Sequence, residues 1–145
     1  MAIPDLDNSS GVDGFKNQCD IKNGIQRAQS FVVTKSGKPT NLTFTSFQKG
    51  RPTDDLNIEL YDAAADGVPT GTALSTNTLK HDSIGWSPRN YTVHPNINVV
   101  AGKRYAFVLK AGGQYACYGV AYSDCGAYLG GGESFSGNGG GSYTT

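Results

Sequence analysis

The sequence predicts an all-β fold, a single antiparallel β-sandwich of about seven or eight short strands. Short segments in which apolar and polar residues alternate recur along the chain, and glycine- and proline-containing turns separate them. The composition suits strands and turns, with 20 glycines and 8 tyrosines among 145 residues. This length corresponds to one domain, so one sandwich is expected over 1–145, with an irregular segment at 1–27 and a glycine-rich tail at 130–145. A closed barrel is the alternative all-β arrangement.

The first half of the chain contains three expected strands. The first covers 28–33, and the second covers 41–47, where apolar residues alternate with threonines. The segment 49–52 contains a glycine and a proline, so we expect it to end the second strand. Residues 56–61 alternate in the same way, although two aspartates just before them would also suit the first turn of a helix. A strand is preferred because it places Ile58 on the same face as the leucines on either side of it, which a helix does not.

The second half of the chain contains the strongest strand signal, at 104–110. Shorter strands are expected at 73–79 and 90–93. The Gly112-Gly113 pair is expected to form a turn that folds 104–110 into a hairpin with 115–122. The residues on the inward faces of these strands are expected to fill one core. They are Phe31, Val33, Leu42, Phe44, Leu56, Ile58, Leu60, Val93, Phe107 and Leu109.

The charge balance indicates which partners to expect. Lysine plus arginine and aspartate plus glutamate number 12 each, which argues against nucleic acid or an anionic membrane surface as a partner. No apolar stretch approaches the length of a membrane span, so membrane insertion is not expected. The first residues lack the charged and apolar regions of a signal peptide. A cytoplasmic protein is one interpretation, but we expect a module excised from a secreted or extracellular protein, because low charge, abundant polar residues and possible disulfides suit such a surface.

Three cysteines raise the question of disulfide bonds. Cys117 and Cys125 are separated by a spacing that suits a bridge closing a short loop, which leaves Cys19 unpaired. A long-range bridge involving Cys19, or three buried thiols, are the open alternatives.

Sequence motifs of common enzyme classes are missing from the chain. It contains no nucleophile elbow, zinc-protease helix, phosphate-binding loop or dinucleotide fingerprint. His81 lies in a polar turn and His94 precedes a proline, and each is expected to be a surface residue. Pairs of carboxylates are present, but short sandwich loops rarely build the cleft that glycoside hydrolysis needs. We therefore expect a protein that is not an enzyme.

Aromatic residues offer the best candidate binding positions. Tyrosines cluster between 115 and 128, and exposed aromatic rings can stack on the apolar faces of sugars while polar side chains bind the hydroxyls. One set of these tyrosines is expected in the core, because neighbouring residues of a strand face opposite sides. A half-buried tryptophan closing the end of the sandwich is the competing interpretation for the one tryptophan. The candidate ligand-binding residues are Tyr118, Tyr122, Asp124, Tyr128 and Trp86.

Adjacent acidic residues raise the question of a metal ion. Asp54 with Asp55, or Asp5 with Asp7, could contribute to a calcium site in the loops of a sandwich. Neither pair has an EF-hand spacing, so turn and cap chemistry is the other interpretation. No other cofactor is expected.

The order of several short motifs resembles that of β-sandwich accessory modules attached to secreted bacterial carbohydrate-active enzymes and surface proteins. The resemblance spans about residues 28–132 and implies a jelly-roll-like, lectin-like sandwich that binds carbohydrate. Such modules usually continue into a last strand after the glycine-rich tail, whereas this chain stops at residue 145. The motifs are Gln29-Ser30-Phe31, Gly50, Pro52, Asp55-Leu56, Ile58, Tyr61, Pro69 to Leu74, Ala101 to Ala106, Tyr118-Gly119 and Tyr128 to Gly131.

Two hypotheses for function follow. The first is a non-catalytic carbohydrate-binding module that holds a polysaccharide or oligosaccharide by aromatic stacking and polar contacts, next to a catalytic domain of the same parent protein. The second is a structural or adhesive sandwich domain of a surface protein without glycan specificity. Exposed aromatic rings beside polar side chains favour the first hypothesis. Buried aromatic rings together with an open sheet edge favour the second.

Overall fold

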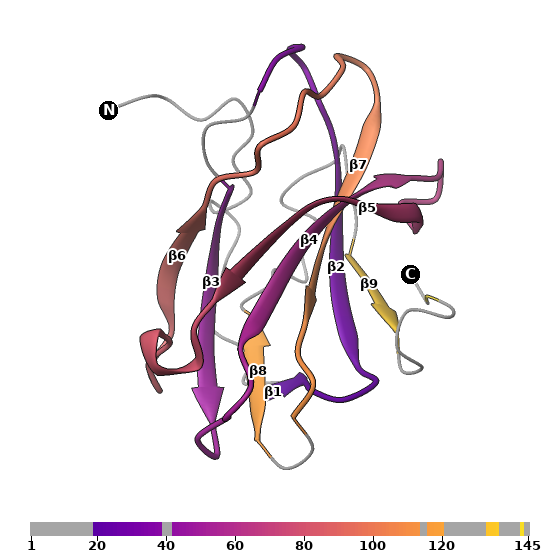
Figure 1. Ribbon diagram of the computed structural model, residues 1–145. Coiled ribbons are helices and arrows are strands. Elements are labelled where there is room, and N and C mark those ends of the chain that lie inside the picture. The colour runs from indigo at the N-terminus through magenta and orange to yellow at the C-terminus, as the bar shows by residue number, and fades with distance from the viewer. Residues whose placement is uncertain (1–18, 39–41, 114–115, 121–132, 137–142, 144–145) are drawn as a thin grey trace.

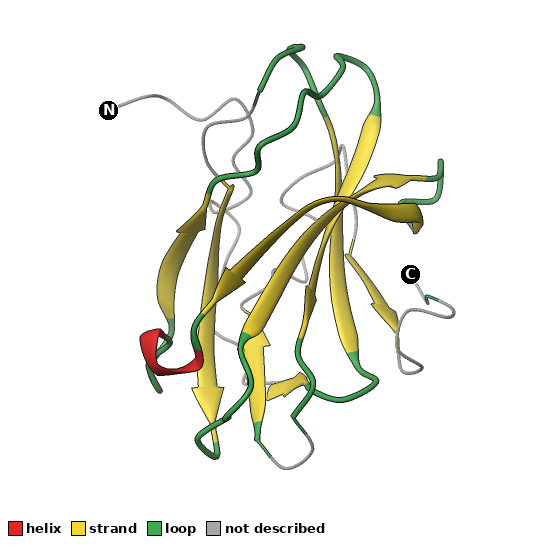
Figure 2. Ribbon diagram, in the orientation of Figure 1, coloured by secondary structure: helices red, strands yellow, loops and turns green. Residues whose placement is uncertain are grey.

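The computed structural model describes residues 19–38, 42–113, 116–120, 133–136 and 143. Within them the chain forms nine strands and one short 3-10 helix. The strands make two antiparallel sheets that pack face to face, as Figures 1 and 2 show. The predicted antiparallel β-sandwich is thereby confirmed, whereas the jelly-roll-like connectivity stays a prediction. Within the described ranges, no helix has the length and apolar character needed to cross a bilayer.

Each sheet combines strands from both halves of the chain. The four-stranded sheet has the order β1-β8-β3-β6, formed by Cys19–Ile21, Cys117–Val120, Leu42–Lys49 and Arg89–Val93. The five-stranded sheet has the order β5-β4-β7-β2-β9, formed by Pro69–Leu79, Leu56–Ala63, Arg104–Lys110, Gln26–Val32 and Glu133–Ser136. The 3-10 helix η1 (His81–Ser83) lies on the connection between β5 and β6. Because that connection leaves one sheet and enters the other, it runs across one end of the sandwich (Figure 1).

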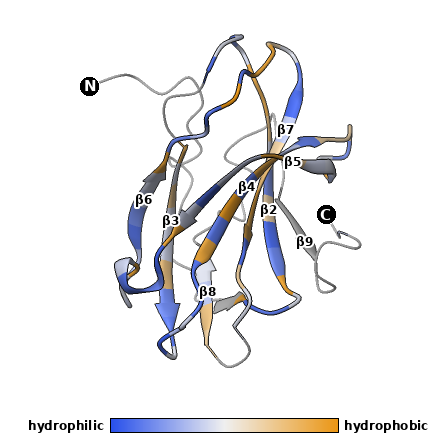
Figure 3. Cartoon of the chain, viewed as in Figure 1, coloured by the Kyte–Doolittle hydropathy of each residue, from blue (hydrophilic) through white to orange (hydrophobic). Residues whose placement is uncertain are grey.

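The core lies between the sheets and is built by alternation along the strands. On β4, Leu56, Ile58 and Leu60 are buried, and apolar and polar positions alternate along this strand (Figure 3). The strand prediction for this segment is therefore confirmed over the helix. Of the ten predicted core residues, seven are buried, and Phe31, Leu42 and Phe107 are partly buried against them.

The outward face of the five-stranded sheet is also largely buried, which simple alternation does not predict. Ala106 and Val108 of β7 are inaccessible, and so is Ser30, which pairs with Ala106 from β2. Glu59 pairs with Val108 on this face and is buried as well. Part of the cover is the loop between β4 and β5, because a Cβ atom added at Gly67 would lie 2.6 Å from the Ser30 hydroxyl oxygen.

The Gly112-Gly113 segment does not form the predicted hairpin. It connects β7 of the five-stranded sheet to β8 of the four-stranded sheet, so the two strands are not partners. The Gly112 N–H donates to a carboxylate oxygen of Asp54 at 2.6 Å, and the Asn23 N–H donates to the Gly113 carbonyl at 2.8 Å. A side chain at Gly113 would collide with the Asp54 carboxylate. The glycines therefore allow a close approach to Asp54 rather than a tight turn.

The two ends of the chain hold more regular structure than expected. The segment predicted to be irregular, 1–27, contains β1 and the beginning of β2. The predicted glycine-rich tail, 130–145, contains β9, which pairs with β2 at the edge of the five-stranded sheet. Backbone pairing with a neighbouring strand supplies the order that the side chains of these segments do not predict.

The packing of the β4–β5 loop over Ser30 predicts different costs for two alanine substitutions. Gly67 and Gly71 both have positive φ, at 87° and 73°, so alanine strains the backbone at each by about 1 to 2 kcal/mol. Nothing lies within 4 Å of a Cβ at Gly71, whereas Gly67→Ala also overpacks Ser30, for a further ~1 to 3 kcal/mol. Urea unfolding of the two variants measures the difference, and equal costs would contradict this packing.

Candidate functional site

Tyr118, expected to contact ligand, is instead a core residue. Its side chain is fully buried, and its hydroxyl donates to the main-chain carbonyl of Asp54 at 2.6 Å. Burial raises the pKa of Tyr118, and the nearby charges of Asp54 and Asp55 raise it further. The prediction for Tyr118 is wrong because this position of β8 faces the interior between the sheets, among the core residues of both.

The other predicted tyrosine positions lie in a part of the chain that is not described. Tyr122, Asp124, Tyr128 and Cys125 all fall outside the described residues. Cys117 is disulfide-bonded, which confirms that it forms a bridge. Its pairing with Cys125 stays a prediction.

Trp86 is the predicted site residue that the structure places at the surface. It lies between η1 and β6, and it is 62% exposed. The interpretation that it is half-buried and closes the sandwich is therefore wrong. An exposed indole offers a large, rigid apolar surface on which the ring of a ligand can pack.

The two residues before Trp86 are fixed to the four-stranded sheet. Ile84 is buried in the core, and its carbonyl accepts the side-chain amide of Gln48 at 2.8 Å. The Gly85 carbonyl accepts the Gln48 N–H at 2.9 Å, and the Gly85 N–H donates to the Tyr91 hydroxyl at 2.9 Å. Ile84 thus lies inside the core, whereas Trp86, two residues later, lies at the surface.

The beginning of the same connection is fixed by Asp55. Its carboxylate accepts the His81 N–H at 2.9 Å and lies 3.0 Å from His81 Nδ1 and 3.2 Å from Lys80 Nζ. An ionised carboxylate only accepts hydrogen bonds, so Nδ1 carries the hydrogen in this contact. The His81 backbone N–H, followed by its ring and by Lys80, lowers the pKa of Asp55 to about 2. The ionised Asp55 thus anchors η1 to the start of β4.

Arg51 lies beside the exposed tryptophan. Its guanidinium carbon is 5.8 Å from the centroid of the Trp86 ring, a distance at which a cation is attracted to an aromatic face. Arg89, at the start of β6, places its Nε 4.0 Å from a Cβ built at Gly85, the residue before Trp86. Lys49, Arg51, Trp86 and Arg89 are all exposed and together are called the Trp86 patch.

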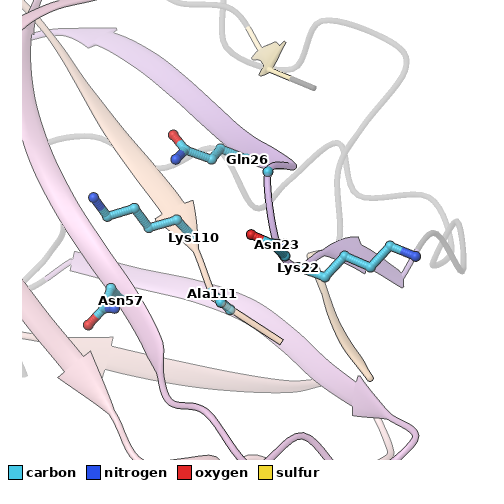
Figure 4. A pocket seen from close by; sticks show the side chains of 8 residues that line it. Lys22, Asn23, Gln26, Asn57, Lys110 and Ala111 are labelled. Atoms are coloured by element: carbon cyan, nitrogen blue, oxygen red, sulfur yellow. The ribbon is translucent and has the colours of Figure 1, made fainter. Parts of the chain in front are cut away.

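A polar hollow of about 330 Å³ lies at the β1–β2 turn and was not predicted. Figure 4 shows that its side chains come from segments far apart in the sequence, which explains why no local motif indicated it. Several of its polar groups already bind other residues: Lys110 pairs with Glu59, Asn57 accepts from Thr78, and Gln26 accepts from Tyr143. It is lined by Lys22, Asn23, Gly24, Gln26, Asn57, Lys110, Ala111 and Gly112. Since no aromatic ring is among them, it offers no stacking surface.

The aspartates considered for calcium bind protein groups. Asp54 accepts from Gly112, and Asp55 accepts from His81 and Lys80. In the part of the chain that the structure describes, no three histidine, cysteine or acidic side chains gather in a way that could hold a metal ion. These partners are far away in the sequence, so the pair connects distant segments rather than capping a local turn, while Asp5 and Asp7 lie outside the described residues.

Comparisons with models of protein families, with curated proteins and with solved structures found no match to this chain. The geometry of the residues themselves therefore carries the functional assignment.

The buried position of Tyr118 predicts that Tyr118→Phe affects stability and leaves ligand binding unchanged. Losing the hydrogen bond to the Asp54 carbonyl should lower the free energy of unfolding by about 0.5 to 1.5 kcal/mol. Urea unfolding and glycan affinity, measured on the same preparation, check both parts. If Tyr118→Phe weakens glycan binding without changing the free energy of unfolding, Tyr118 contacts the ligand and its assignment to the core is contradicted.

The contacts of Asp55 predict a specific pH dependence of stability. The folded-state pKa of about 2 lies below the usual 3.8, so the ionised carboxylate stabilises the fold above about pH 4. This contribution disappears as the pH falls from about 4 to 2. The difference in melting temperature between the native chain and Asp55→Asn should therefore shrink across that interval.

Thermal unfolding at several pH values measures this difference, with Asp82→Asn as the control, because it removes a charge from η1, the helix that Asp55 contacts. A melting-temperature difference for Asp55→Asn that stays constant from pH 6 to about pH 2 would contradict the assigned contacts.

Proposed function

We propose that this chain is a non-catalytic glycan-binding domain that holds sugar rings against Trp86. The observation that carries the proposal is an exposed tryptophan on a backbone fixed by Gln48 and Tyr91. Burying an indole face against the C–H face of a pyranose removes apolar surface from water. Because the backbone before Trp86 is already fixed, little of that gain is lost in ordering the chain.

Polar side chains near Trp86 suit the hydroxyl groups of a saccharide. β6 begins three residues after Trp86, and the outward side of β6 and β3 carries exposed threonine and asparagine side chains. Thr45 donates to Asn90 at 2.6 Å, and the hydroxyls of Thr43 and Thr92 are 2.8 Å apart. These pairs form a polar row along the sheet that can bind further sugar units of a chain.

The surroundings of such a domain are also part of the proposal. The disulfide at Cys117 supports a secreted or extracellular location, since disulfides persist in oxidising compartments. A single stacking site of this kind binds weakly, so attachment to a catalytic domain or repetition in a parent protein would raise its effective affinity.

A structural or adhesive domain remains the competing function, and one observation favours it. Among the described strands, β6 is the last of its sheet and pairs with β3 alone, and an edge of this kind can pair with another strand. Arg89 and Asn90 are exposed on it, and a charged residue at such an edge works against pairing.

The proposal predicts that Trp86→Ala weakens glycan binding at least about tenfold, a loss of ~1.4 kcal/mol or more. A glycan array followed by calorimetry on the best ligand measures it. Leu74→Ala is the matched control, because Leu74 is an exposed apolar residue at a distant position on β5. Binding unaffected by Trp86→Ala, or no binding to any glycan, would contradict the proposal and favour the structural domain.

A further inference from the structure

We infer that the Trp86 patch takes acidic sugars, with Arg51 binding the carboxylate or sulfate of a residue stacked on Trp86. The inference rests on the proposed function and assigns its ligand class. It is carried by the backbone of Arg51, by cations around Trp86 that have no acidic partner among the described residues, and by the Arg51 guanidinium 5.8 Å from the centroid of the Trp86 ring.

The backbone at Arg51 adopts a conformation that a side chain disfavours. Its φ is +56°, and it is the one residue other than glycine with positive φ among those described. Gly50 precedes it with φ +77°, and the buried Pro52 follows it. A residue with a Cβ is strained in this region, and such strain concentrates at functional positions. Glycine at position 51 would relieve the strain, so the arginine is placed there at a cost in stability.

The cations of the Trp86 patch have no acidic partners within the described structure. No ion pair joins a described carboxylate to Lys49, Arg51 or Arg89. The two acids that follow Arg51 along the chain are occupied, Asp54 by Gly112 and Asp55 by His81 and Lys80. Asp82 on η1 is exposed and is the nearest acid along the chain to Trp86. Counted over the residues that the structure describes, three cations stand against this one acid, so the patch is positive although the whole chain has a formal net charge of zero.

The cation–π contact between Arg51 and Trp86 places both side chains where an acidic sugar can reach them together. A guanidinium over an aromatic face keeps its N–H groups directed outward, where a carboxylate or sulfate can accept two of them. Trp86 remains 62% exposed beside Arg51, so a sugar ring has indole surface on which to stack. A uronate or sulfated sugar can therefore pack its ring on the indole of Trp86 while its acidic group accepts two hydrogen bonds from the guanidinium of Arg51.

Three dextrans that share one backbone test the charge preference. Neutral dextran, carboxymethyl-dextran and dextran sulfate are compared by affinity electrophoresis at roughly 50 and 300 mM salt. The native chain should prefer the charged polymers, and the carboxylate and sulfate arms distinguish the two acidic groups. Arg51→Gly should weaken binding to the preferred charged polymer about fivefold or more, while its unfolding midpoint stays equal or rises.

Lys38→Gln is the matched charge control. Lys38 is exposed and comes before β3 in the chain, whereas Arg51 comes after it. Removing this charge should leave binding unchanged. If Lys38→Gln and Arg51→Gly lower the affinity for the charged polymer equally, the binding is non-specific electrostatic attraction. That result would overturn the inference.

The remaining outcomes separate this inference from the proposed function. Trp86-dependent binding to neutral glycans with no preference for charged dextrans would overturn the acidic ligand and leave the glycan-binding function standing. Tighter Trp86-dependent binding to a single-stranded oligonucleotide than to dextran sulfate would overturn it in favour of nucleic acid. Absence of binding to every polymer, neutral or charged, would overturn both.

Discussion

The contact between Gln48 and the segment before Trp86 determines what the surface of this domain presents. The side-chain amide and the backbone N–H of Gln48 donate to the carbonyls of Ile84 and Gly85. These bonds attach the connection between the sheets to the end of β3, next to the buried Ile84 and the exposed Trp86. The Gln48 side-chain oxygen has no hydrogen-bond partner among the described residues. A buried acceptor left unpaired costs stability. The role of Gln48 is therefore to position the segment before Trp86 rather than to stabilise the fold.

The adjacent aspartates at the start of β4 organise the same end of the molecule. Asp55 anchors η1 through His81, while Asp54 binds Gly112 on the connection between β7 and β8. Both connections pass from one sheet to the other, so two neighbouring carboxylates hold the sheets together where the polypeptide crosses between them. Their engagement also leaves the cations of the Trp86 patch without these two acids as partners.

Alternation of apolar and polar residues along the strands predicts which side chains face the core. It fails on the outward face of the five-stranded sheet, where a loop covers residues that alternation would leave exposed. Leu56, Ile58 and Leu60 are buried as expected, because a side-chain period of two follows from strand geometry alone. The burial of Ser30 was not predictable, because it depends on a loop from β4 to β5 that folds over the outward face.

The candidate site was predicted only in part, because proximity in sequence and proximity in space differ here. The tyrosine cluster suggested a binding face, yet Tyr118 occupies the core at the centre of the inner face. Gly112 and Gly113 resemble a hairpin turn but connect two sheets, a role that depends on contacts with Asp54. Arg51 and Trp86 are far apart along the chain, so no local pattern indicated their contact. Trp86 itself was predictable as a candidate, whereas its exposure depends on Gln48 and Ile84.

Fluorescence of Trp86 tests the central claim most directly, because it is the one tryptophan in the chain and its emission reports on this position alone. Acrylamide quenching is measured on the free domain and again at saturation with the glycan that binds best. The free domain should be quenched as readily as an exposed indole, and the bound glycan should shield the ring and lower the quenching constant. A quenching constant that is low in the free domain, or that does not change at saturation, would contradict the account that Trp86 is displayed to hold a sugar.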